Sequence, residues 1–151
     1  MARNSWRSLS ERGFTILEAV VVLIIVAAVV GALTPAVRTQ LLRARVNRAA
    51  GIAAADLYLA QSLAARRRSP VVVVFDQAAK TVTLAGSDTT FQVRYYGSEG
   101  EFNVPQFTAS ATSLQVLPNG MASASVSLTL SDGTYTREIR MSRAGQIRVV
   151  R

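Results

Sequence analysis

The chain has 151 residues, contains no cysteine and no histidine, and carries a formal net charge of +8. The absence of these two residue types excludes Ser-His-Asp and Cys-His catalytic systems and the usual zinc sites, because the general base or the metal ligands are missing. It also excludes disulfide bonds, so a domain outside the cytoplasm would depend on its core alone. The length allows one domain with an appended segment, and the excess of arginine is typical of proteins that bind nucleic acid.

The apolar residues are concentrated near the N-terminus. The run from Phe14 to Leu33 is twenty residues long and contains a single ionisable side chain, that of Glu18. As a helix it would be about 30 Å long, which matches the hydrocarbon core of a bilayer. Residues 20–30 show no amphipathic period, so a membrane-spanning helix is favoured over a buried helix of a soluble protein. An ordinary secretory signal peptide fits less well, because no small-x-small cleavage site follows the run.

Two features distinguish this segment from a plain membrane anchor. Glu18 lies within the apolar run, where an acid usually has a partner, although its position near the end of the span also allows a tolerated interfacial acid. Gly13 separates a charged leader from the apolar run and offers a protease a backbone without a Cβ. Cleavage after Gly13 would leave a free amine on Phe14, one helical turn from the Glu18 carboxylate, and this amine is a natural partner for the acid.

The segment Arg12-Gly13-Phe14-Thr15-Ile16-Leu17-Glu18, followed by an apolar run, resembles the type IV prepilin motif of pilins and of type II secretion pseudopilins. The resemblance implies that a membrane prepilin peptidase cleaves between Gly13 and Phe14 and N-methylates Phe14. It also implies that Glu18 pairs with the N-terminus of a neighbouring pilin or pseudopilin when subunits assemble on an inner-membrane platform. Pro35 stands where the family commonly has a proline.

The orientation of the span does not follow from charge alone. Three arginines precede the span and four follow it closely, so the positive-inside rule does not choose between the two orientations. The prepilin resemblance places the leader, residues 1–13, in the cytoplasm. It places one span, residues 14–34, in the inner membrane and the rest of the chain in the periplasm.

Residues 35–68 are expected to form an amphipathic helix. Apolar side chains at spacings of three and four predict a stripe that packs on a sheet or on another helix: Leu42, Val46, Ala49, Ala53, Leu57, Ala60 and Ala64. Pro35 removes the helical hydrogen bond to the carbonyl of Gly31, so we expect a kink or an opened turn there, either with a role in assembly or as a simple bend. The segment has a net charge of +6, and its first arginines, Arg38 to Arg48, are placed to meet membrane lipid headgroups, acidic patches of adjacent subunits, or only solvent.

Residues 69–151 alternate between short β-type runs and turn signals. Val71–Phe75 is a continuous apolar run, which suggests a strand buried on both faces. Six further runs follow, at 81–84, 91–96, 114–117, 126–130, 135–141 and 147–150, with an irregular stretch from 97 to about 112. We therefore expect an α+β, pilin-like fold in which a long N-terminal helix packs on a largely antiparallel β-sheet of about seven strands.

This order of elements resembles minor pseudopilins and pilins of the GspH/FimT type. The similarity lies in Ala64-Ala65-Arg66, Ser69-Pro70-Val71, Leu117-Pro118-Asn119-Gly120, Asp132-Gly133 and Gly145-Gln146-Ile147-Arg148-Val149. It implies a structural minor pseudopilin that joins a periplasmic pseudopilus for protein transport by type II secretion. The alternative is a minor pilin that binds DNA for pilus assembly or DNA uptake. Some members associated with competence pili bind DNA through basic residues near the last strand, which makes Arg143, Arg148 and Arg151 candidate nucleic-acid contacts.

The sequence contains no phosphate-binding glycine loop and no nucleotide fingerprint, so no enzyme and no cofactor are expected. Loop carboxylates could build a calcium site, but their spacing does not follow an EF-hand-like loop and a solvated loop is favoured. These carboxylates belong to Asp88, Glu99, Glu101 and Asp132. A membrane protein held by an uncleaved signal anchor, without a role in filaments, is a further alternative.

Overall fold

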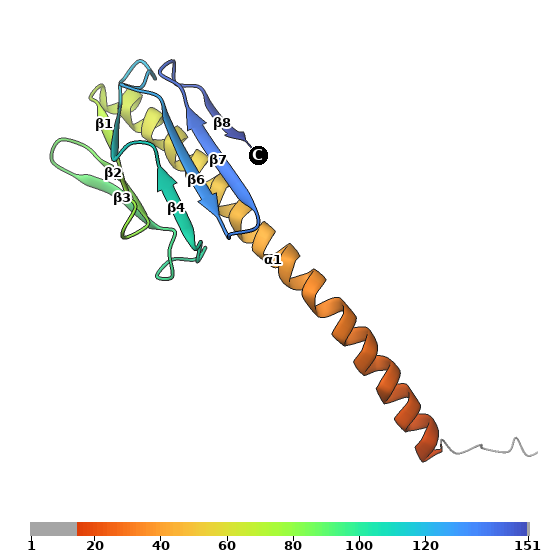
Figure 1. Ribbon diagram of the computed structural model, residues 1–151. Coiled ribbons are helices and arrows are strands. Elements are labelled where there is room, and N and C mark those ends of the chain that lie inside the picture. The colour runs from red at the N-terminus through yellow and green to blue at the C-terminus, as the bar shows by residue number, and fades with distance from the viewer. Residues whose placement is uncertain (1–14, 151) are drawn as a thin grey trace, which may run out of the picture. The chain divides into compact units, whose positions relative to one another are not determined.

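The computed structural model describes residues 15–150, with the backbone alone for residues 33–36. A long helix, α1 (Ile16–Arg67), is followed by eight strands (Figure 1). The chain divides into two compact units, Met1–Arg38 and Thr39–Arg151. The first unit contains the N-terminal part of α1, and the second contains its C-terminal part together with all eight strands.

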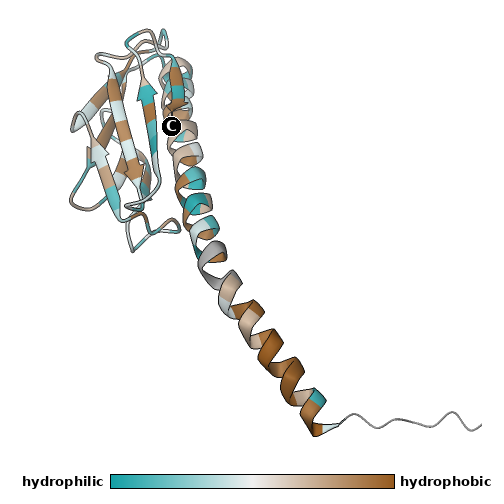
Figure 2. Ribbon diagram, turned by 45° about the vertical axis from the view of Figure 1, so that its right-hand side comes forward, coloured by the Kyte–Doolittle hydropathy of each residue, from teal (hydrophilic) through white to brown (hydrophobic). Residues whose placement is uncertain are grey.

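The described part of the first unit is helical and apolar on all sides. Its large side chains are exposed, as shown by Ile16 at 85%, Leu23 at 67% and Ile24 at 63% of their full accessible surface. Figure 2 shows that most residues along the N-terminal part of α1 are hydrophobic. Among the described residues, α1 is the one helix long and apolar enough to cross a membrane. Burying so much apolar surface requires a lipid or protein environment outside this unit.

The strands of the second unit form two antiparallel sheets of four strands each. The first sheet has the order β3-β2-β1-β5 and the second has the order β4-β6-β7-β8. The strands of the first sheet are β1 (Val71–Asp76), β2 (Thr81–Ala85), β3 (Thr90–Tyr95) and β5 (Ser113–Val116). Those of the second sheet are β4 (Gln106–Ala109), β6 (Val126–Ser131), β7 (Thr136–Met141) and β8 (Ile147–Val150).

One hydrophobic core joins the C-terminal part of α1 to both sheets. The predicted helix stripe is buried from Val46 to Ala64, and its many alanines let the backbone of α1 approach the strands closely. Leu42, which the stripe also included, is 40% exposed, because it precedes the part of the helix that the sheets cover. The core facing α1 is made of large aliphatic side chains from both sheets, including Leu84, Leu114, Leu128, Leu130 and Ile139.

The predicted α+β fold with antiparallel strands is confirmed, with three differences in detail. Eight strands form two sheets, whereas the sequence suggested about seven strands in one sheet, because strand runs do not reveal which strands pair. The additional strand is β4, in the stretch expected to be irregular; only two of its four residues, Phe107 and Ala109, are apolar and buried. The prediction that Val71–Phe75 is buried on both faces is wrong. Val74 is 38% exposed, because the helix covers one face of this antiparallel sheet.

Candidate functional site

The predicted cleavage and methylation positions, Gly13 and Phe14, lie outside the described residues. Thr15, the first described residue, caps the N-terminus of α1. The backbone N–H of Glu18 donates to Thr15 Oγ1 at 3.2 Å, and the N–H of Ala19 donates to the Thr15 carbonyl at 3.1 Å. The first bond satisfies an N–H group that the first turn of a helix cannot pair internally, and the second is the first i→i−4 bond of the helix.

Glu18 projects an exposed side chain from this first turn. Its apolar neighbours, Ile16 and Leu17, are 85% and 75% exposed. A carboxylate near the positive end of a helix dipole is stabilised there, but in an apolar environment it still needs a positively charged or hydrogen-bonding partner. The arrangement thus presents an acid at the end of an uncovered apolar helix, where a partner can reach it.

The helix continues through the predicted kink. Residues 31–35 are helical, and nothing lies within 4 Å of the position that a Cβ on Gly31 would occupy. The bend of the helix at Gly31 and Pro35 stays a prediction. The division of the helix into two parts at residue 34 also stays a prediction.

The candidate nucleic-acid contacts lie at and after the β7–β8 turn, except Arg151, which is outside the described residues. Arg143 is in the turn, where its Nε and Nη2 atoms both donate to the carbonyl of Ser123 at 3.4 Å. Arg148 is exposed on β8 and stands opposite Arg140 of β7 in the strand register. The structure thus brings Arg148 next to another arginine, while Arg143 is held against a backbone carbonyl.

Arg140 is already paired. Its Nε and Nη2 atoms bind the two carboxylate oxygens of Glu138 at 2.8 and 2.7 Å. This pairing holds the pKa of Glu138 below its usual range and raises that of Arg140. A neutralised arginine attracts a phosphate less than an unpaired one, so the positive charge available on this sheet face is smaller than the sequence suggests.

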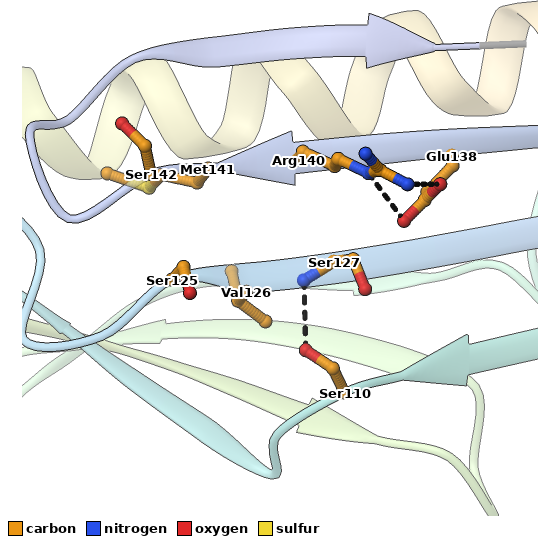
Figure 3. Close-up of a pocket in the computed structure, with 8 residues that line it drawn as sticks. All are labelled: Ser110, Ser125, Val126, Ser127, Glu138, Arg140, Met141 and Ser142. Atoms are coloured by element: carbon orange, nitrogen blue, oxygen red, sulfur yellow. Dashed lines mark hydrogen bonds and ion pairs between the residues drawn. The ribbon is translucent and has the colours of Figure 1, made fainter.

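A shallow hollow lies on the same face of the second sheet (Figure 3). It is lined by the Glu138–Arg140 pair, by Val126 and Met141, and by four serines: Ser110, Ser125, Ser127 and Ser142. Ser110 Oγ accepts a hydrogen bond from the backbone N–H of Ser127 at 2.9 Å and fastens the edge of the sheet. The hollow offers hydroxyl groups for polar contacts, and its one carboxylate, that of Glu138, is held in the ion pair with Arg140.

The loop carboxylates considered for calcium are dispersed. Glu101 pairs with Arg48 at 3.5 Å, and Asp88 accepts a hydrogen bond from Ser87 at 3.0 Å. Asp132 Oδ1 accepts the backbone N–H groups of Thr134 and Tyr135 at 2.8 and 2.7 Å. Within residues 15–150 no three acidic side chains gather in a group that could hold a metal ion.

Sequence reasoning missed a buried polar cluster centred on Asp56 of α1. Asp56 is 3% exposed, and its carboxylate accepts four hydrogen bonds. Two come from Arg94, from Nε at 2.6 Å and from Nη2 at 3.0 Å, and the others come from Gln92 and from the Tyr96 hydroxyl, both at 3.2 Å. Burial, followed by the charge of Asp56, raises the pKa of Tyr96 far above its usual range, and the bond to Asp56 raises that of Arg94. The cluster binds α1 to β3 and to the residue that follows it.

A second missed contact explains two of the sequence patterns. The Gln61 side-chain amide on α1 donates one hydrogen bond to the Gly120 carbonyl at 3.0 Å and one to the Gly145 carbonyl at 2.7 Å. Gly145 has a φ of +81°, and a Cβ there would overlap with the Gly120 carbonyl. The turn after Pro118 and the turn before β8, which are far apart in sequence, therefore meet at one glutamine of the helix.

Comparison with known proteins agrees with this architecture. The sequence model of a family described as type II transport protein GspH matches residues 49–145, well over half of the chain. The fold is similar to that of the type IV minor pilin FimU of Pseudomonas aeruginosa strain PAO1 in a crystal of space group P21, with a TM-score of 0.58 and 21% identity. That match covers 72% of this chain and 90% of the other. In space group P65 the TM-score is 0.56 at 18% identity, covering 70% and 92% of the two chains. No curated protein matches the sequence significantly.

Proposed function

Because the chain belongs to the GspH family of type II transport proteins, we propose that it is a structural minor pseudopilin that joins a periplasmic pseudopilus for type II secretion. A prepilin peptidase cleaves it after Gly13 and N-methylates Phe14, and Glu18 then pairs with the N-terminus of a neighbouring subunit. The observation that carries this proposal is the exposed acid in the first turn of an exposed apolar helix, joined to a compact unit with its own core.

The proposal assigns each part of the chain a place. The leader, residues 1–13, is cytoplasmic and is removed, and residues 14–34 span the inner membrane once and later pack inside the filament. Residues 35–68 continue the helix, with a kink at Gly31 and Pro35, and residues 69–151 form the periplasmic β-domain. The partners are other pseudopilins or pilins, the prepilin peptidase, the inner-membrane assembly platform and membrane lipid. No catalytic step, metal or cofactor belongs to this role.

Processing is tested with Gly13→Glu in a host that expresses a prepilin peptidase. The protease can approach the backbone closely at Gly13 because glycine has no Cβ. A glutamate there adds both a side chain and a charge, so we expect an unprocessed, membrane-bound precursor. Mass spectrometry of the purified chain reads the N-terminus directly. A mature chain that starts at Phe14 in this variant would refute the proposed site.

Assembly is tested with Glu18→Ala, which should be cleaved normally but enter filaments poorly. The matched control is Glu99→Ala, which removes the same charge from an exposed loop of the compact unit. Filaments are sheared from cells and the subunit is quantified in them. Equal incorporation of the two variants would remove the pairing role of Glu18 while leaving the processing site intact.

The second candidate is a DNA-binding minor pilin. It is favoured by Arg148, exposed beside Arg140, and by Arg143 in the adjacent turn, and it is weakened by the pairing of Arg140 with Glu138. A gel-shift assay with the full chain in detergent decides between the two candidates. Phosphate contacts would make binding fall steeply with salt, and Arg143→Gln with Arg148→Gln would reduce it. If the chain does not shift the DNA, or if the shift does not depend on salt, this candidate is removed.

A further inference from the structure

A second cluster of arginines lies where the helix enters the compact unit. Arg43 and Asn47 lie on α1, and Tyr135 and Arg137 lie at the start of β7. The guanidinium carbons of Arg43 and Arg137 are 5.9 and 5.2 Å from the centre of the Tyr135 ring. Both cations therefore contact one aromatic side chain, a geometry that holds each guanidinium in place.

Asn47 fixes this arrangement from the helix. Its Oδ1 accepts a hydrogen bond from the Tyr135 hydroxyl at 3.0 Å and another from Arg137 Nε at 2.7 Å. This contact uses the Nε atom of Arg137, and among residues 15–150 neither of its two terminal nitrogens donates a hydrogen bond to the protein. A pre-oriented guanidinium with its terminal nitrogens available suits the oxygens of a phosphate group.

The charges of this cluster are not balanced by a carboxylate, unlike those of three other arginines. Arg48, Arg94 and Arg140 each form an ion pair with a carboxylate. Neither Arg43 nor Arg137 takes part in any ion pair found among residues 15–150. Asp132 is the acid in the adjoining turn, and one of its oxygens is occupied by two backbone N–H groups. The cluster is therefore a concentrated positive site on the surface of the compact unit.

The chain itself limits how far this site can be from a membrane. Arg43 follows Leu33, the last residue of the apolar run, by ten residues. Ten residues span about 15 Å as a helix and at most about 36 Å fully extended. The headgroup layer adds roughly 5–7 Å beyond the hydrocarbon core on each side. If the apolar run is inserted as proposed above, anionic headgroups are the nearest abundant phosphates to this site.

We propose that Arg43, Tyr135 and Arg137 form a binding site for anionic phospholipid headgroups, which docks the β-domain on the surface of the membrane that anchors the chain. The inference rests on the proposed membrane anchoring. Each arginine near an anionic surface strengthens binding about fivefold, and this effect is screened by salt. The docked state would hold the compact unit close to the bilayer until contacts with other subunits replace the lipid.

The test uses the full chain reconstituted into vesicles of phosphatidylcholine, with or without phosphatidylglycerol. The sequence contains no cysteine, so Thr134→Cys, in the exposed turn beside Tyr135, gives a single fluorescent label. Quenching by headgroup-labelled lipid then reports how close this turn lies to the membrane. Ala124→Cys is the matched label, since Ala124 is exposed just before β6 begins, whereas Thr134 follows the end of the same strand.

We expect stronger quenching of the Thr134 label in phosphatidylglycerol vesicles than in neutral ones, with a smaller change at Ala124. Arg43→Gln with Arg137→Gln should lower the ratio of docked to undocked domains by roughly 25-fold at low salt. Arg66→Gln with Arg68→Gln removes the same charge from the last turn and end of α1 and should have little effect. With the unsubstituted arginines, raising sodium chloride to about 0.5 M should abolish the difference, which tests the site independently of any variant.

Each of the following results would overturn the inference. Equal quenching in neutral and anionic vesicles, or an unchanged signal in the Arg43/Arg137 variant, shows that the cluster is merely solvated. If adding inorganic phosphate to the chain in neutral vesicles changes the fluorescence of the Thr134 label, the site binds a free anion. If adding duplex DNA changes it, the site binds nucleic acid. A chain that floats with neither kind of vesicle refutes the membrane anchoring as well, whereas insertion into both without a difference refutes the headgroup site alone.

Discussion

The N-terminal and C-terminal parts of α1 each contain one acidic residue, in opposite surroundings. Asp56 is buried and receives four hydrogen bonds from side chains of its own chain. Glu18 is exposed among exposed apolar residues, and the contact that the described residues give it is the bond between its backbone N–H and Thr15. The acid in the C-terminal part of the helix thus has its partners within the folded chain. The N-terminal part exposes both its acid and its apolar side chains to partners outside the chain.

The strongest way to break this contrast is Asp56→Ala. The substitution leaves the Tyr96 hydroxyl and the Gln92 amide without their acceptor and removes the counter-charge of Arg94. Because the Arg94 side chain is 31% exposed, we expect a loss near the lower end for buried pairs, about 3 kcal/mol in the free energy of unfolding. Urea unfolding of the chain in detergent, followed by near-ultraviolet circular dichroism, measures it. Glu18→Ala is the control and should leave the unfolding free energy unchanged; equal losses would contradict the contrast.

A second test concerns the packing of the turns that Gln61 of the C-terminal part of α1 binds. Gly145→Ala combines a positive φ with a steric overlap on the Gly120 carbonyl, and we expect a loss of roughly 2–4 kcal/mol. Gly133→Ala is the matched control, since its φ is +95° but nothing lies within 4 Å of its Cβ. That variant should lose only about 1–2 kcal/mol for the backbone conformation. Thermal melting compares the two, and equal losses would show that the packing at Gly145 is unimportant.

The smallest expected effect is that of Tyr96→Phe at neutral pH. Asp56 keeps its bonds from Arg94 and Gln92, so the loss should be about 1 kcal/mol. The raised pKa of Tyr96 means that above pH ~10 the unfolded chain releases a proton that the folded chain retains, so stability falls as pH rises. This contribution is about 1.4 kcal/mol per pH unit, and Tyr96→Phe should lack it. Urea midpoints between neutral and alkaline pH measure the slope, with Tyr95→Phe as the half-exposed control.

The sequence predicted the helix stripe well because helical periodicity is a local property. It placed a strand at 91–96, close to the observed β3, but it did not reveal which side chains face the core, because the alternation there is inverted. Gln92, Arg94 and Tyr96 occupy alternate positions and face the core, while Val93 and Tyr95 face outward and are each 44% exposed. An apolar-inward assignment would choose the opposite face. The signal that could have corrected it is Asp56, a single acid on an otherwise apolar helix face, which requires buried donors opposite it.

The division into two sheets and the short strand β4 could not be predicted for a different reason. Which strands pair depends on contacts between residues far apart in the chain, and β4 contributes only Phe107 and Ala109 to the core. The candidate site shows the same limit. Glu18 was identified from the apolar run and the prepilin resemblance, and Arg143 and Arg148 from the resemblance to GspH/FimT-type proteins. The pairing of Arg140 with Glu138, and the meeting of Arg43 with Arg137 at Tyr135, require the folded chain.

The bridge made by Gln61 also sets a limit on when the compact unit can fold. Its amide joins the helix to a carbonyl 84 residues later. During synthesis, the helix emerges long before the turn that it must hold, and the second sheet lacks its last strand until residues 147–150 have been made. Such long-range contacts form late. The compact unit therefore cannot finish folding before β8 has emerged, and until then Gln61 lacks the Gly145 carbonyl that it binds in the folded chain.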